Sequence, residues 1–227
     1  MVFDLDGVLV DTARLHFMAW KRLAEEIGVT LAGQLQESLK GVDRAASLEI
    51  VLGESSRAFD AAQKVVLAER KDLLYRESVR NFSRTDVLPG ALAALKACRQ
   101  KALKIAVASS SRNAQAIILA TGLAGEFDVV VDGNAISRAK PHPEAFLRAA
   151  SLLEVAPGDC IGVDDAIAGV RAIKRASMYA IGIGAAPLLA SAGADAVIPS
   201  IAALAIEGYL RVENVPPGPG SQAGHGR

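Results

Sequence analysis

The sequence lacks several features that would define whole classes of protein. It contains only two cysteines, Cys98 and Cys160, which are too few for a disulfide framework and do not have metal-ligand spacing. Its 25 basic side chains equal its 25 acidic ones, so no overall field draws the chain to nucleic acid or to an acidic membrane surface. Any site for an anion must therefore be local.

Targeting and membrane-spanning signals are also missing. The chain reaches Asp4 without a basic region followed by an apolar one, so we expect no secretory leader. The most apolar long window, residues 179–198, is interrupted by glycine, proline and aspartate and predicts strand, loop and helix. Together with the low cysteine content, this leads us to expect a cytoplasmic protein.

What is present is the composition of a packed α/β domain. Of the 227 residues, 51% are apolar, which excludes a mainly disordered chain and allows one large domain or a domain with an insertion. Short β-branched runs recur, each followed by a turn and a helical pattern, and this order predicts a parallel sheet covered by helices on both faces, a doubly wound or Rossmann-like core. The expected strands are 2–5, 103–108, 127–131, 160–163 and 179–183.

A helical segment interrupts this pattern between the first and second strands. Phe17, Trp20 and Leu23 follow helical spacing, and residues 61–79 carry a second long helical pattern. The pattern predicts an all-helical cap over 13–83, inserted into a core of 1–12 and 84–214, with a hinge at the two adjacent crossings. Residues 215–227 are rich in proline and glycine and are expected to be disordered.

Two carboxylates leave the end of the first strand, at Asp4 and Asp6. Strand alternation points them to the same side, and the turn at Gly7 lets them approach one small volume. One could attack an electrophile while the other moves a proton, and their mutual repulsion calls for a cation. Taken alone, the pair could also be an acidic turn in solvent.

Three further polar clusters follow later strands. Ser109 to Asn113 precede a helix and could hold a phosphate or cap that helix. Lys140 could neutralise an anion or be an exposed lysine before a helix that starts with proline. Asp164 and Asp165 could bind a hard cation or act as helix caps. Because carboxyl ends of parallel strands meet at one edge of a sheet, we expect all four clusters to converge there.

Taken together, these clusters resemble the four-motif signature of the haloacid dehalogenase superfamily of phosphotransferases. The matching residues are Asp4-x-Asp6-Gly7-Val8-x-x-Asp11-Thr12, then Ser109, Lys140 and Asp164-Asp165. The helical insertion resembles the four-helix cap of the phosphoglucomutase-like branch, and two of its motifs are more similar to the β-phosphoglucomutase family than to general sugar phosphatases. Those motifs are His16-Phe17-Met18-Ala19-Trp20 and Leu39-Lys40-Gly41-Val42-Asp43-Arg44, followed by Ser47.

The resemblance implies roles for the core residues. Asp4 would attack phosphorus to form an aspartyl phosphate, and Asp6 would act as general acid and base on the sugar oxygen. Ser109 and Lys140 would hold the transferring phosphate. Mg²⁺ would be the cofactor, and its protein ligands would be Asp4, the backbone carbonyl of Asp6, Asp164 and Asp165.

The resemblance also implies a substrate site shared with the cap. His16 would position Asp6 as the cap closes, although an isolated histidine on a helix usually has no such role. Lys40 and Arg44 bracket Gly41, and their positive side chains could meet the second phosphate of a bisphosphorylated sugar, although such residues alone usually form a solvated basic turn. The resemblance implies that this distal phosphate site is formed by Arg44, Ser111, Arg112 and Asn113. Further substrate contacts implied by the match are Thr12, Trp20, Ser47 and Lys71.

The resemblance implies the function of the β-phosphoglucomutase family, which is to interconvert β-D-glucose 1-phosphate and glucose 6-phosphate through β-glucose 1,6-bisphosphate. Two alternatives stay open. One is a magnesium-dependent sugar-phosphate phosphatase on the same scaffold, and the other is a non-catalytic phosphate-sensing module. The expected partner is a small sugar phosphate, with no nucleic acid and no membrane, and the chain is expected to act as a monomer.

Overall fold

A parallel sheet forms the centre of the molecule in the computed structural model, which describes residues 1–32, 35–39, 42 and 44–210. Six strands pair in the order β3-β2-β1-β4-β5-β6, all of them parallel. Their bounds are β1 Val2–Phe3, β2 Ala106–Ala108, β3 Val129–Val131, β4 Ile161–Asp164, β5 Tyr179–Ile183 and β6 Ala196–Ile198. Strand β1 lies in the middle, so the residues that follow it reach the carboxyl edge between β2 and β4.

Helices cover both faces of this sheet, as the apolar strands predict. Val2 packs in one apolar cluster with residues of α7 and α8, whereas Phe3 packs in a second cluster with residues of α5 and α6. None of the helices in the described ranges is both long and apolar enough to span a bilayer. The core helices are α5 Ala91–Gln100, α6 Ala114–Ala120, α7 Glu144–Leu153, α8 Ile167–Arg175, α9 Ala186–Ser191 and α10 Ile206–Leu210, with 3-10 turns at Arg84–Asp86, Ala124–Glu126, Pro157–Asp159 and Ile201–Ala203.

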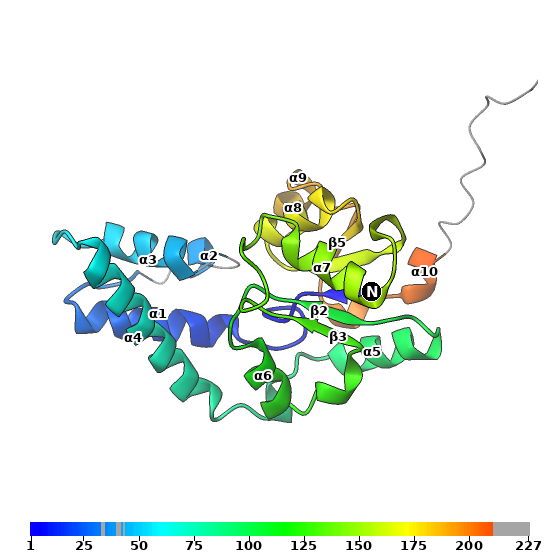
Figure 1. Cartoon of the computed structure of the whole chain (residues 1–227), viewed down its shortest axis with the longest axis horizontal. Helices are drawn as coiled ribbons and strands as arrows, with labels where there is room; N and C mark the ends of the chain where they lie inside the picture. Colours follow the sequence, from blue (N-terminus) through cyan, green and yellow to red (C-terminus); the bar gives the residue numbers. More distant parts are fainter. Residues whose placement is uncertain (33–34, 40–41, 43, 211–227) are drawn as a thin grey trace, which may run out of the picture.

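The inserted helices form a separate layer beside the sheet (Figure 1). They are α1 Ala13–Glu26, α2 Leu35–Leu39, α3 Arg44–Gly53 and α4 Ala61–Val79. Helix α1 buries Trp20 and Leu23, as its spacing predicts, and it packs along α4. Helix α4 has the predicted bounds, but Val65 and Val66 on it are 58% and 62% exposed, so they do not belong to its buried face.

The two crossings between the cap and the core lie side by side. Val10 and Val87 form an antiparallel bridge, and the backbone N–H of Asp11 donates to the carbonyl of Asp86 at 3.0 Å. The predicted juxtaposition of the two crossings is therefore present. It brings Thr12, at the start of α1, next to the carboxyl edge of the sheet.

The fold class is confirmed: a doubly wound parallel sheet carries an all-helical cap. One element was predicted wrongly, because the window 179–198 ends in strand β6 rather than in a helix. Strand β6 has only three residues and pairs with β5 at the edge of the sheet, so it has no periodicity that a sequence pattern could show. Strands β1, β2 and β3 are shorter than predicted, and the predicted tail 215–227 lies outside the described residues.

Candidate active site

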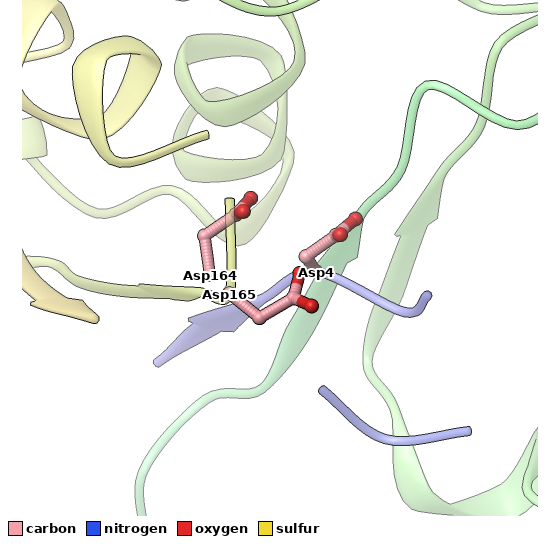
Figure 2. Close-up of side chains that lie close together, drawn as sticks. All are labelled: Asp4, Asp164 and Asp165. Carbon is pink, nitrogen blue, oxygen red and sulfur yellow. The ribbon is translucent and has the colours of Figure 1, made fainter. Parts of the chain in front are cut away.

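Three carboxylates meet where β1 and β4 end. Asp4 follows β1, and its backbone N–H donates to the carbonyl of Val163 at 2.9 Å, which continues the pairing of β1 with β4. Asp164 ends β4 and Asp165 follows it. One oxygen from each of these aspartates lies within 4.8 Å of the others, as Figure 2 shows for their side chains. Such a set of hard oxygen donors can hold a divalent cation.

Lys140 lies against two of these carboxylates. Its Nζ is 2.7 Å from Oδ1 of Asp4 and 2.8 Å from Oδ2 of Asp164, and its side chain is almost fully buried. Burial raises the pKa of Asp4 well above its usual value, against the opposing charge of Lys140. For Lys140, burial favours the neutral form, but Asp164 and Asp4 outweigh it and raise the pKa. The structure therefore brings together Asp4, the predicted pair Asp164 and Asp165, and the predicted lysine.

Two glycines allow the carboxylates to sit close to the backbone. Gly7 has φ +79°, and a Cβ there would lie 2.3 Å from Oδ2 of Asp165. Gly169, in α8, would place a Cβ 1.8 Å from Cγ of Asp164. Because atoms cannot approach this closely, any side chain at either position must displace an aspartate.

Asp6 lies in a different environment from Asp4, at the boundary with the cap. The hydroxyl of Thr12 donates to its Oδ1, the hydroxyl of Ser109 donates to its Oδ2 at 3.2 Å, and Nε2 of His16 lies 3.7 Å from Oδ1. Burial acts to raise the pKa of Asp6, but the contacts with His16 and Thr12 hold it below its usual value. The lowered pKa keeps Asp6 ionised.

The cap side of this site is a packed group of four side chains. Nδ1 of His16 lies 2.9 Å from Nζ of Lys71, and the His16 ring stacks on Tyr75 with centroids 4.0 Å apart. The Lys71 ammonium lies 4.9 Å from the centre of the Trp20 ring. Burial, and then the charge of Arg44, lower the pKa of Lys71 to about 7. Burial also lowers the pKa of His16.

A second cluster connects the cap to the helix that follows β2. Nη2 of Arg44 and Nδ2 of Asn113 both donate to Oδ1 of Asp72, at 2.6 Å and 3.0 Å. The hydroxyl of Ser111 accepts from the backbone N–H of Asn113 at 3.2 Å. Burial lowers the pKa of Arg44, and the nearby Asp72 opposes this effect. The charge of Arg112, which is exposed, lowers the pKa of Arg44 further. The predicted distal residues that are described therefore lie together.

Two of the predicted substrate contacts, Trp20 and Ser47, are buried side chains. Trp20 is 2% exposed and Ser47 is 1% exposed, and the Ser47 hydroxyl donates to the carbonyl of Val42 at 3.3 Å. Trp20 therefore supports Lys71 within the cap, and Ser47 supports the start of α3. Lys40 and Gly41 are outside the described residues.

Sequence reasoning missed two side chains of this region, Asp72 and Tyr75. Both lie on α4, next to Lys71 or one turn beyond it, and Tyr75 is fully buried against His16. Helical spacing from Lys71 was the available signal for Tyr75, because residues i and i+4 share a face. Nothing in the sequence indicated that Asp72 would meet Asn113, 41 residues further along the chain.

Comparison with known proteins identifies the class. Residues 1–177 match the family model of haloacid dehalogenase-like hydrolases, and the chain belongs to that family of enzymes. It is 40% identical to a β-phosphoglucomutase of Bacillus subtilis, over 91% of this chain and 92% of that protein. It is 32% identical to a phosphorylated carbohydrates phosphatase of Thermotoga maritima, over 80% and 82% of the two chains. A solved β-phosphoglucomutase from Clostridium difficile matches with a TM-score of 0.85 and 37% identity, covering 92% of this chain and 94% of that one.

Proposed function

We propose that this enzyme is a β-phosphoglucomutase that interconverts β-D-glucose 1-phosphate and glucose 6-phosphate through β-glucose 1,6-bisphosphate. The observation that carries the proposal is that the two carboxylates after β1 have different surroundings. Asp4 faces Lys140 and the acidic pair, whereas Asp6 faces Thr12 and the cap residue His16. The relative from Bacillus subtilis supports the same activity.

The residues fit a magnesium ion at the carboxyl edge of the sheet. Asp4, Asp164 and Asp165 would supply carboxylate oxygens, and the backbone carbonyl of Asp6 would supply a further ligand. When bound, Mg²⁺ would draw negative charge from the phosphoryl oxygens and so reduce their repulsion of an attacking carboxylate. A cation there would also favour the ionised form of Asp4, which burial alone disfavours.

Phosphoryl transfer would proceed in two halves. In the first half, the 6-hydroxyl of β-glucose 1-phosphate attacks the phosphorus held on Asp4, its proton passes to the ionised Asp6, and the bond from phosphorus to the Asp4 oxygen breaks to leave the bisphosphate. In the second half, after the bisphosphate has turned around in the site, the freed Asp4 carboxylate attacks the phosphorus at the 1-position, the bond from that phosphorus to the sugar oxygen breaks, and Asp6 returns the proton to that oxygen. Ser109 and Lys140 would hold the phosphoryl oxygens throughout.

The cap, taken as residues 13–83, would select the sugar over water as the acceptor. The contact of His16 with Asp6 makes the position of the acid and base depend on the cap. Arg44, Ser111, Arg112 and Asn113 would bind the distal phosphate, which a bisphosphate intermediate carries and a simple phosphatase substrate does not need. A closed cap would exclude water from the aspartyl phosphate.

A sugar-phosphate phosphatase is the second candidate, and the relative from Thermotoga maritima favours it. A coupled assay separates the two functions. Purified enzyme with Mg²⁺ and β-glucose 1,6-bisphosphate receives either β- or α-glucose 1-phosphate, while glucose 6-phosphate and free phosphate are measured together. We expect rapid formation of glucose 6-phosphate from the β anomer only, and little free phosphate.

Phosphate release that exceeds isomerisation would establish the phosphatase instead. If neither product forms, and if acyl phosphates leave Asp4 unmodified, the chain is a non-catalytic phosphate-binding module. Asp4→Asn serves as the matched control, because it keeps the size of the side chain and removes the nucleophile.

A further inference from the structure

An acidic side chain lies among the groups proposed for the distal phosphate. Asp72 accepts at Oδ1 from Arg44 of the cap and from Asn113 of the core, at 2.6 Å and 3.0 Å. Its Oδ2 lies 3.1 Å from Nε of Arg76, one helical turn along α4. The Asp72 side chain is only 16% exposed. A carboxylate thus uses the donors that a substrate anion would need.

The Asp72 carboxylate opposes the binding of any other anion at these donors. A phosphate that binds Arg44 and Asn113 must replace Asp72 at those donors, and otherwise it stands beside a like charge in a half-buried place. The same bond to Asn113 also joins α4 of the cap to the segment before α6 of the core. Displacing Asp72 therefore frees a contact between the two parts of the molecule.

We propose that Asp72 is an internal anion that fills the distal phosphate site in the absence of substrate and that the substrate phosphate displaces it. It acts on the substrate through Arg44 and Asn113, because it occupies their donor groups until the phosphate replaces it. It also sets specificity, since only a ligand that binds these donors better than a carboxylate does can take its place. The inference rests on the proposed function for the nature of the ligand, a doubly phosphorylated sugar.

The test uses inorganic phosphate and nuclear magnetic resonance on the full chain. The side-chain amide signal of Asn113 reports the distal site directly and is followed during titration of the wild type, Asp72→Asn and Glu69→Gln. Asp72→Asn keeps the shape and removes the charge. Glu69→Gln makes the same change of charge at an exposed position of the same helix. Circular dichroism and thermal melting verify that each variant is folded.

We expect phosphate to bind about tenfold more tightly at the Asn113 signal in Asp72→Asn, and with wild-type affinity in Glu69→Gln. In steady-state assays with β-glucose 1,6-bisphosphate, KM falls in Asp72→Asn by more than kcat changes. A residue that only supports the fold would lower kcat or the melting temperature without tightening phosphate binding.

Equal or weaker phosphate binding in Asp72→Asn overturns the inference, whatever the enzyme's activity. The outcome for the proposed function is separate. Tighter binding in an enzyme that shows no mutase turnover supports the role of Asp72 and contradicts the mutase. Mutase turnover with unchanged phosphate binding in Asp72→Asn supports the proposed function and contradicts the role of Asp72.

Discussion

At the scale of single residues, Lys140 compensates part of the negative charge of the acidic site. Its ammonium lies within 2.8 Å of both Asp4 and Asp164, and all three side chains are buried. Buried charges of one sign are strongly unfavourable unless an opposite charge or a metal accompanies them. Lys140 therefore shares the task of charge compensation with the proposed magnesium ion.

Replacing this lysine tests that shared task. Lys140→Met is expected to lower the free energy of unfolding by about 3–5 kcal/mol in the absence of metal, because it leaves buried carboxylates unpaired. Saturating Mg²⁺ is expected to raise the melting temperature of Lys140→Met more than that of the wild type. Differential scanning calorimetry measures both effects, with Lys96→Met on the exposed face of α5 as the control. A loss that Mg²⁺ does not reduce would contradict the placement of the cation beside Asp4 and Asp164.

The second residue-scale prediction concerns Lys71 and pH. Its pKa is lowered from 10.5 to about 7 by burial. Between these two values the unfolded chain binds a proton that the folded protein does not. The free energy of unfolding should therefore rise with pH in this window, by up to about 1.4 kcal/mol per pH unit.

Chemical denaturation at pH 7.5 and pH 9 measures this slope. Lys71→Met is expected to lose it, and Lys96→Met, at an exposed position, is expected to keep it. A slope shared by the wild type and Lys71→Met would show that another group titrates there.

The sequence allowed prediction of the core residues of the site but not of all their partners. Asp4 follows a strand, Asp164 ends one, and Lys140 lies in a loop beyond one, so the parallel sheet brings them together. The contact of Asp72 with Asn113 depends on where the cap lies, and no local pattern encodes that position. The same limit applies to the stacking of Tyr75 on His16, which needs α1 and α4 to be packed side by side.

At the scale of elements, a glycine in helix α8, Gly169, allows this helix to pack closely against Asp164. Alanine is normally more stable than glycine inside a helix by about 1 kcal/mol. At Gly169 we expect the opposite sign, a loss of about 2–3 kcal/mol in Gly169→Ala, because its Cβ would collide with Asp164. Weaker Mg²⁺ binding should accompany the loss.

Gly208 in α10 provides the matched control, since a Cβ there would meet nothing within 4 Å. Gly208→Ala is expected to stabilise the protein by about 0.5–1 kcal/mol. Urea denaturation and isothermal titration with Mg²⁺ measure both variants. If Gly169→Ala were as stable as the wild type with unchanged metal affinity, the close approach of α8 to Asp164 would not matter for the site.

Elements with a strong local pattern were predictable, and short elements held by their neighbours were not. Helix α4 and strand β5 have the bounds that the sequence predicts, because 19 residues of helical pattern and five continuous strand residues give a clear signal. Strand β6 was missed because its three residues are a strand only through pairing with β5. The strand ends shifted for the same reason, since pairing partners decide where each strand stops.

At the scale of the whole molecule, contacts between the cap and the core gather beside the carboxyl edge of the sheet. The crossings near Val10 and Val87 join the cap to the core covalently, and the contact of Asp72 with Asn113 joins them non-covalently. Between these places lie Asp6 and His16. A motion of the cap therefore changes the surroundings of the proposed acid and base while Asp4 stays fixed to the sheet.

The central claim is that Asp4 carries the phosphoryl group, and reductive trapping tests it most directly. The enzyme with Mg²⁺ receives β-glucose 1,6-bisphosphate, is quenched with acid within milliseconds and is treated with borohydride, which reduces an aspartyl phosphate selectively. Mass spectrometry then locates the modified position in the peptide that contains both Asp4 and Asp6. We expect modification at Asp4 alone, and none in Asp4→Asn. Modification at Asp6, or no modification during active turnover, would contradict the claim.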